Sequence, residues 1–160
     1  MLQELVTDGS VQPVNGTAFA VTPTLREAYA EGDEEELAEV AIREAALASL
    51  RLLAADVDAP ATSLPPRRAV LAVDADAGVV TARPDLDDAV VRIAGPVSME
   101  RVIAAYVDTA AAEADVLKAM EAIDAADLGD EDAELVVGDA LDHDLAWYAN
   151  QELPFLLELL

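Results

Sequence analysis

The sequence predicts a single α+β domain, a two-layer sandwich that pairs a mostly antiparallel or mixed sheet with helices on one face. Its 160 residues suit one domain and are too few for two substantial ones. Apolar residues at helical spacing predict helices over 33–55 and 110–126. Short apolar runs typical of strands occupy 68–73, 89–94 and 102–108. We expect residues 1–160 to share one core, and a ferredoxin-like arrangement is one candidate.

The first elements precede residue 33. Residues 17–21 are β-prone and predict a strand. A short helix should follow from about residue 24 to Glu31, ended by Gly32. Two starts are open for it: Thr22 caps the helix with Pro23 at its first position, or Thr24 and Glu27 form a capping box.

The helix over 33–55 has a clear beginning. Asp33 and Glu36 have the spacing of a capping box, which gives both a structural role. Glu34 and Glu35 lie in the first turn, where the helix dipole favours negative charge. The apolar stripe of this helix comprises Leu37, Val40, Leu47, Leu50 and Ala54.

The second half of the chain supplies most of the predicted sheet. Too few residues join 89–94 to 102–108 for a crossover helix, so at least one neighbouring pair of strands should be antiparallel. The helix over 110–126 should pack on the same sheet through one apolar face. Residues 145–149 either continue a helix or form a last strand before a helix over 151–160, and we favour the strand.

The net charge of −24 excludes several partners. Such a surface repels nucleic acid phosphates and anionic lipid, so we expect no direct nucleic-acid binding and no membrane docking. It suits a basic protein partner, or imitation of nucleic acid, although a merely solvated acidic surface is the simpler explanation. Residues 1–6 lack a basic leader, and no run approaches the roughly 20 apolar residues of a membrane span, which favours the cytoplasm.

The available chemistry is narrow, since the chain has no Cys and one His. Disulfides, thiolate nucleophiles and Cys-based metal sites are thereby excluded, and no motif calls for a cofactor. Asp74 and Asp76 end an apolar run and could hold Mg²⁺ in a metal-assisted hydrolase. Phosphatases of the haloacid-dehalogenase type, which use such a pair of Asp residues, also need a lysine, but Lys118, the only lysine, lies on a helical face. We therefore expect an ordinary polar turn at Asp74 and Asp76.

Two further segments are candidates for function. Glu31, Glu34 and Glu35 exceed what helix capping requires and could receive an Arg-rich partner. His143, flanked by carboxylates, is a weak candidate for a general base or metal ligand, and we expect a structural role away from any polar cleft. Trp147 should be a largely buried anchor, whose truncation to Ala would cost about 3 to 5 kcal/mol.

Several segments together resemble a known family: Val21-Thr22-Pro23, residues 29–37, residues 48–53, residues 67–70 and the stretch from Asp142-His143 to Leu153. This pattern is similar to an uncharacterised actinobacterial family, the domain of unknown function DUF6912, over nearly the whole chain. The resemblance implies a high-GC bacterial origin and the cytoplasm, but no activity, cofactor or partner.

The chain also departs from the family pattern in two places. Family members begin with a short strand upstream of the segment that matches residues 1–6, which leaves open that this chain starts at an internal Met and lacks its first strand. The Asp74-x-Asp76 pair is not a shared feature of the family, which weakens the hydrolase hypothesis. The leading expectation is a non-enzymatic acidic interaction or regulatory protein, with the hydrolase and the nucleic-acid mimic as alternatives.

Overall fold

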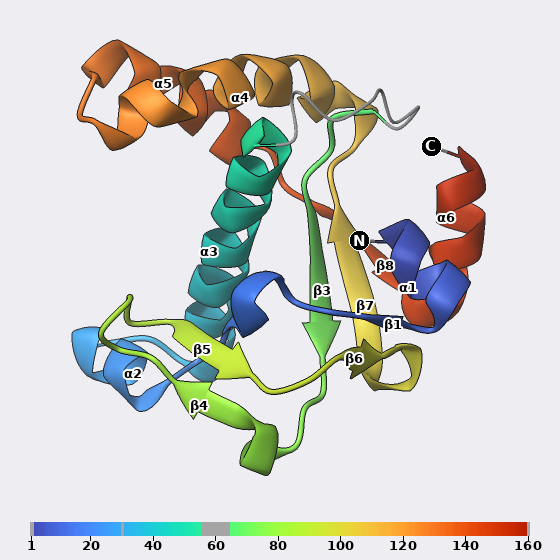
Figure 1. The fold of residues 1–160 in the computed structure, drawn as a ribbon. Helices are drawn as coiled ribbons and strands as arrows, with labels where there is room; N and C mark the ends of the chain where they lie inside the picture. Colours follow the sequence, from blue (N-terminus) through green and yellow to red (C-terminus); the bar gives the residue numbers. More distant parts are fainter. Residues whose placement is uncertain (1, 30, 56–64, 160) are drawn as a thin grey trace.

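The computed structural model describes residues 2–29, 31–55 and 65–159, and it is a mixed α+β fold, as predicted (Figure 1). The helices are α1 (Leu2–Asp8), α2 (Pro23–Ala28), α3 (Glu34–Ala55), α4 (Glu113–Asp127), α5 (Glu131–Leu141) and α6 (Leu153–Leu159). The strands are β1 (Ser10–Val11), β2 (Thr17–Phe19), β3 (Ala69–Val73), β4 (Val80–Ala82), β5 (Val90–Ile93), β6 (Val97–Ser98), β7 (Val102–Val107) and β8 (Ala146–Ala149). The helices predicted over 33–55 and 110–126 are present, and so is the final strand followed by a helix.

The strands form three small antiparallel sheets, where the sequence had predicted one larger sheet. Their orders are β1-β6, β2-β5-β4 and β3-β7-β8. The strand predicted over 89–94 therefore does not share a sheet with those over 68–73 and 102–108. Gly95, at a φ of 83°, and Pro96 follow β5 and turn the chain away, so that β6 pairs with β1. Among the described strands no sheet has more than three members, whereas a ferredoxin-like fold needs four.

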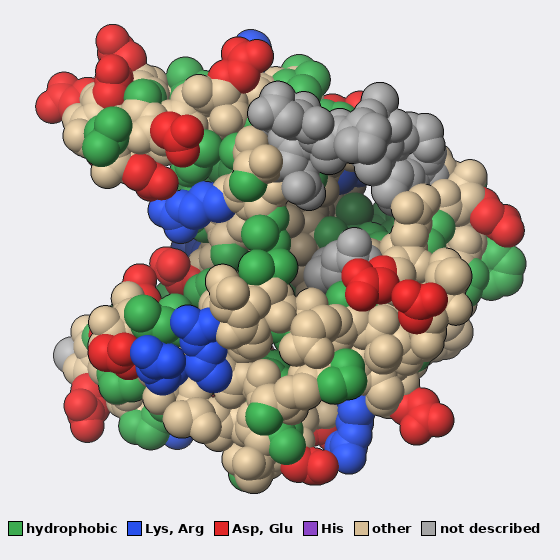
Figure 2. Space-filling model, viewed as in Figure 1, with side chains coloured by type: hydrophobic (Ala, Val, Ile, Leu, Met, Phe, Trp, Pro, Cys, Tyr) green, Lys and Arg blue, Asp and Glu red, His purple; other side chains and the backbone are tan. Residues whose placement is uncertain are grey.

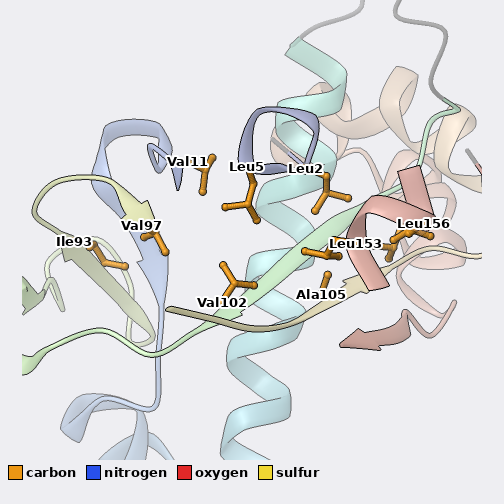
Figure 3. Close-up of a cluster of buried hydrophobic side chains, with 10 residues drawn as sticks. Leu2, Leu5, Val11, Ile93, Val97, Val102, Ala105, Leu153 and Leu156 are labelled. Atoms are coloured by element: carbon orange, nitrogen blue, oxygen red, sulfur yellow. The ribbon is translucent and has the colours of Figure 1, made fainter. Parts of the chain in front are cut away.

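The sheet β3-β7-β8 has helices on both faces, which corrects the prediction of helices on one face (Figures 1 and 3). Alternate residues of β3 and β7 pack in a core cluster with α1 and α6. The buried members of this cluster are Leu2, Leu5, Val11, Ile93, Val97, Val102, Ala105, Val107, Leu153 and Leu156. On the other face lies α3, where the hydroxyl of Ser49 accepts a hydrogen bond from the backbone N–H of Ala69 at 3.0 Å.

The long helix α3 connects the two ends of the molecule (Figure 1). Near its start, Leu37 packs with Leu25 of α2 and Ala89 beside β5. Near its end, Leu50 packs against buried apolar residues of α4 and α5. The predicted apolar stripe is thus correct, but it is divided between two clusters instead of covering a single sheet. None of the helices in the described ranges is both long and apolar enough to cross a membrane.

The helix starts follow the capping rules. Thr22 accepts a hydrogen bond from the N–H of Leu25 at 3.1 Å with Pro23 in the first turn, so the first of the two proposed starts of α2 is confirmed. The helix ends earlier than expected, at Ala28. Asp33 caps α3, because its Oδ1 accepts a hydrogen bond from the N–H of Glu36 at 2.9 Å.

The cap at Asp33 can be tested directly. Asp33→Ala should lower the free energy of unfolding by about 1 kcal/mol, because the N–H of Glu36 loses its acceptor. Urea denaturation measures this change, and Glu35→Ala is the matched control, since it removes a carboxylate from the same turn without removing the cap. Equal destabilisation by the two substitutions would mean that only charge matters at this terminus.

Candidate functional site

Asp74 and Asp76 follow directly after β3. Both side chains are exposed, and Asp76 forms an ion pair with Arg101 at 3.2 Å. His143 is at the other end of β3, where its carbonyl accepts a hydrogen bond from Arg68. Within the described ranges, no group of three or more His, Asp or Glu side chains gathers at a possible metal position. The structure thus places His143 at the opposite end of β3 from Asp74 and Asp76.

Trp147 is exposed, contrary to the prediction of a buried anchor. It lies on β8, an outer strand of its sheet, and 58% of the residue is accessible to solvent. Successive side chains of a strand point to opposite faces, and on β8 it is Tyr148 that packs on the core cluster with α6. The large loss of stability expected for Trp147→Ala therefore has no structural basis.

The acidic run at the start of α3 is partly engaged within the molecule. Glu31, Glu34 and Glu35 are all exposed. The carboxylate of Glu34, however, forms an ion pair with Arg26 of α2 at 2.8 Å. That pair leaves Glu31 and Glu35 as the carboxylates of this group that have no ion pair to a described residue.

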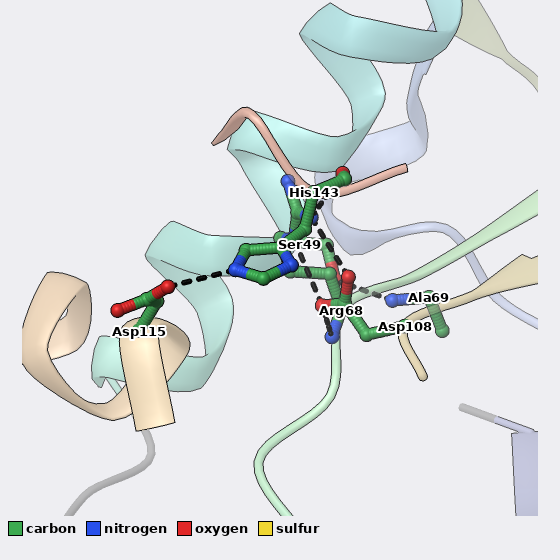
Figure 4. A network of polar contacts seen from close by, with 6 residues as sticks. All are labelled: Ser49, Arg68, Ala69, Asp108, Asp115 and His143. Carbon is green, nitrogen blue, oxygen red and sulfur yellow. Dashed lines mark hydrogen bonds and ion pairs between the residues drawn. The ribbon is translucent and has the colours of Figure 1, made fainter. Parts of the chain in front are cut away.

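His143 joins two parts of the fold (Figure 4). Its Nε2 lies 2.7 Å from Oδ2 of Asp115 in α4, and the ring is partly buried. Its backbone carbonyl accepts a hydrogen bond from Nη2 of Arg68 at 3.0 Å. The residue thereby connects the chain before β8 to the start of α4 and to Arg68 before β3.

Arg68 and Asp108 form a buried ion pair that the sequence had not suggested (Figure 4). The side chains are 2% and 0% exposed, so both charges are removed from water. Asp108 accepts three hydrogen bonds, from the backbone N–H of Arg68 at 2.8 Å, from Nε at 2.9 Å and from Nη2 at 2.7 Å. Beside it, Arg67 pairs with Glu113 at 2.8 Å. These contacts join β3, β7 and α4, and they indicate a structural network more than a catalytic one.

The pair could have been found from the sequence only with the strand register. Arg68 precedes the apolar run of β3, and Asp108 follows that of β7. Because Ala69 lies opposite Val107 in an antiparallel pair, the residues just outside that position meet. The indication of an ion pair in the sequence was therefore a charged residue of opposite sign at each of two strand ends that face one another.

The hairpin of α4 and α5 has an acidic surface (Figure 2). Acidic side chains cover its outer side, and the molecule is hollowed between the hairpin and the part that holds α2, β4 and β5. Two shallow hollows of about 290 and 280 Å³ lie at the junction with α3, on either side of Arg51 and Asp127. The hydrogen bond from Arg51 holds the pKa of Asp127 below its usual range. This ion pair ties α3 to the hairpin.

Comparison with known proteins gives a family without an activity. No curated protein and no solved structure matches the chain. The sequence does match one family description, "Family of unknown function (DUF6912)", over residues 1–157, which is nearly its whole length. The resemblance seen in the sequence is thereby confirmed, and the chain belongs to the DUF6912 family of unknown function.

Proposed function

We propose that this protein is a non-enzymatic interaction protein that binds a basic, amphipathic segment of a partner protein on the α4–α5 hairpin. The observation that supports this most is the combination, on this hairpin, of the exposed Leu128 and Leu135 with carboxylates that have no ion pair to a described residue. The proposal retains the cytoplasmic location expected from the sequence. A mimic of nucleic acid is a narrower form of it, in which the partner is itself a nucleic-acid-binding protein.

The hairpin concentrates negative charge. Residues 113–141 contain one basic residue, Lys118, against ten acidic ones. The acidic residues are Glu113, Asp115, Glu121, Asp124, Asp127, Asp130, Glu131, Asp132, Glu134 and Asp139. Three of them have partners elsewhere in the fold, namely Arg67, His143 and Arg51. Long-range attraction from the remainder would steer a basic segment to this surface.

Apolar side chains stand among these charges. Leu128, in the turn between the helices, is 89% exposed, and Leu135 on α5 is 70% exposed. Glu131, Leu135 and Asp139 follow one another at intervals of one helical turn and share the exposed side of α5. A segment with leucines beside lysines or arginines would cover both the charges and the apolar groups. Charge complementarity therefore favours a basic amphipathic helix as the occupant.

The earlier candidate surface at the start of α3 is less suited to this task. Glu31, Glu34 and Glu35 carry comparable charge, but Glu34 is paired with Arg26. Tyr29 is the large apolar residue exposed beside them. Because the same number of charges can be removed at either surface, the start of α3 provides a matched control for the hairpin.

Binding of a synthetic amphipathic peptide, with Lys and Arg on one face and Leu on the other, tests the proposal. The hairpin variant carries Glu131→Gln, Asp132→Asn and Asp139→Asn, and the control carries Glu31→Gln, Glu34→Gln and Glu35→Gln. Fluorescence anisotropy at several salt concentrations should show about tenfold weaker binding and a flatter salt dependence for the hairpin variant. The control should bind within about twofold of the unmodified chain.

Equal loss of affinity in the two variants would contradict the proposal, because the peptide would then respond only to total charge. A separate Leu135→Ala variant keeps every carboxylate. If the leucine contributes as proposed, this variant should also bind more weakly, with an unchanged salt dependence.

A further inference from the structure

A second surface, on the sheet β2-β5-β4, has the opposite character. The register places Thr17 of β2 and Thr81 of β4 on either side of Arg92 in β5. Cross-strand neighbours project to the same face, so Thr17 and Thr81 share one face of the sheet with Arg92. Arg83 follows β4 opposite Val90, which puts it on that face as well. In Figure 2 basic side chains gather over β4 and β5, at the edge of the hollow that faces the hairpin.

Arg92 is held in place but is only partly engaged. Its Nη1 donates hydrogen bonds to the carbonyl of Asn15 and to Oγ1 of Thr17, the latter at 3.0 Å. Its Nε is buried and has no acceptor among the described residues, nor does any of them accept a hydrogen bond from Nη2. Burial of a donor without an acceptor costs free energy. The lack of an acceptor for Nε therefore needs an explanation.

The turn before β2 fixes the geometry of this arginine. Asn15 has a φ of 57° and Gly16 a φ of 71°, both in the left-handed region. A Cβ at Gly16 would come within 2.9 Å of the carbonyl oxygen of Ile93, so only glycine allows the turn to approach β5 this closely. The Asn15 carbonyl is thereby set against the guanidinium before any ligand arrives.

The charge of Arg92 is also not compensated by an ion pair to a described residue. The chain has 33 acidic residues, yet no described carboxylate lies within ion-pair distance of Arg92. Nearby, Arg83 binds Asp85 through two hydrogen bonds of 2.9 and 2.7 Å. The hydrogen bond from Arg83 is the main cause of the lowered pKa of Asp85, and the charge of Arg92 adds a smaller effect. Asp85 thus neutralises Arg83, so the positive charge of this face that has no ion pair to a described residue belongs to Arg92.

From this arrangement we infer an oxyanion-binding site, in which Arg92 and the hydroxyls of Thr17 and Thr81 bind a phosphate or carboxylate group. Thr17 already accepts a hydrogen bond from Arg92, so its own O–H is free to donate outward. Nη2 can donate a charge-assisted hydrogen bond to such a group, which is roughly twice as strong as a hydrogen bond between neutral groups. The ligand class is therefore a small molecule or side chain that ends in one of these oxyanions.

Titration of the full chain with inorganic phosphate, and separately with acetate, tests the site at constant ionic strength. The ¹H–¹⁵N resonance of Arg92 Nε should shift and saturate with at least one of the two anions, and the anion that binds identifies the ligand chemistry. Arg92→Gln should raise the dissociation constant about tenfold or more, as expected for loss of a charge-assisted hydrogen bond. Thr81→Val should raise it about threefold, as expected for a neutral hydrogen bond.

Arg43→Gln is the matched control, because Arg43 is exposed on α3 and has no ion pair to a described residue. It should leave the dissociation constant unchanged. The inference is overturned if neither anion gives a saturable shift, or if Arg92→Gln binds as well as the unmodified chain. Should Arg92→Gln fail to fold, Thr81→Val decides, since Thr81 has no part in the Asn15 turn; unchanged binding in that variant overturns the inference.

Discussion

Asp108→Ala is expected to lower the free energy of unfolding by about 3 to 5 kcal/mol. The substitution leaves the guanidinium of Arg68 charged, buried and deprived of its two contacts to the carboxylate. It also removes the acceptor for the backbone N–H of Arg68 at the start of β3. Among the ion pairs of the described residues this is the most deeply buried, so its loss should have the largest effect.

Urea denaturation of two control variants separates burial from charge. The double variant Arg68→Met with Asp108→Leu removes both charges, and it should recover part of the stability that Asp108→Ala loses. Asp127→Ala removes the partner of Arg51 in a half-exposed pair, and it should cost at most about 1 kcal/mol. A cost of Asp108→Ala no greater than that of Asp127→Ala would show that the network contributes little to the fold.

Leu50→Ala is expected to cost about 3 to 5 kcal/mol. Leu50 is 0% exposed, and it packs with Val116, Ile123 and Val137, so that one side chain of α3 contacts both helices of the hairpin. Its truncation removes apolar contacts and leaves a cavity between three helices, which cannot close without moving one of them.

Leu52→Ala makes the corresponding control, because Leu52 lies on the same helix and is 47% exposed. Chemical denaturation followed by circular dichroism should show a change of about 0.5 kcal/mol or less. Similar losses for the two leucines would mean that the hairpin is not packed on α3 as described. A variant in which the hairpin no longer packs on α3 should also bind the peptide more weakly. Stability and peptide binding should therefore be measured on the same variants.

The parts of the fold that were predicted from the sequence are those governed by local rules. The cap at Asp33 and the Thr22-Pro23 start of α2 follow from hydrogen bonds within one turn. The apolar residues at helical spacing in α3 and α4 are also a local pattern, and both segments are helices in the structure. Strand character over 68–73 and 102–108 was also correct.

The parts that were missed depend on contacts between distant segments. The run over 89–94 has strand character, but it pairs with β2, which lies more than 70 residues earlier in the sequence, as well as with β4. Helix α5 begins at Glu131, and its N-cap Asp130 accepts a hydrogen bond from the N–H of Ala133 at 3.0 Å. The sequence analysis predicted no helix over 131–141, although Asp130 is a residue type that commonly caps helices.

Among the candidate sites, too, local features could be predicted from the sequence, whereas features that depend on strand register could not. Exposure of Glu31, Glu34 and Glu35 follows from composition and helix position, so it was predictable. The exposure of Trp147 depends on which face of β8 meets the core, and one residue of register decides that. Arg92 is an ordinary charged residue in the sequence, and only the strand register shows that Thr17 and Thr81 are its neighbours.

Chemical-shift mapping with the amphipathic peptide tests the proposed function most directly. In a ¹H–¹⁵N spectrum of the full chain, addition of the peptide should shift the amide resonances of residues 128–139 most strongly. Residues 31–36 and the strands β4 and β5 should change much less. The largest shifts at residues 31–36, or small shifts spread over all acidic segments, would contradict the assignment of the binding surface to the hairpin.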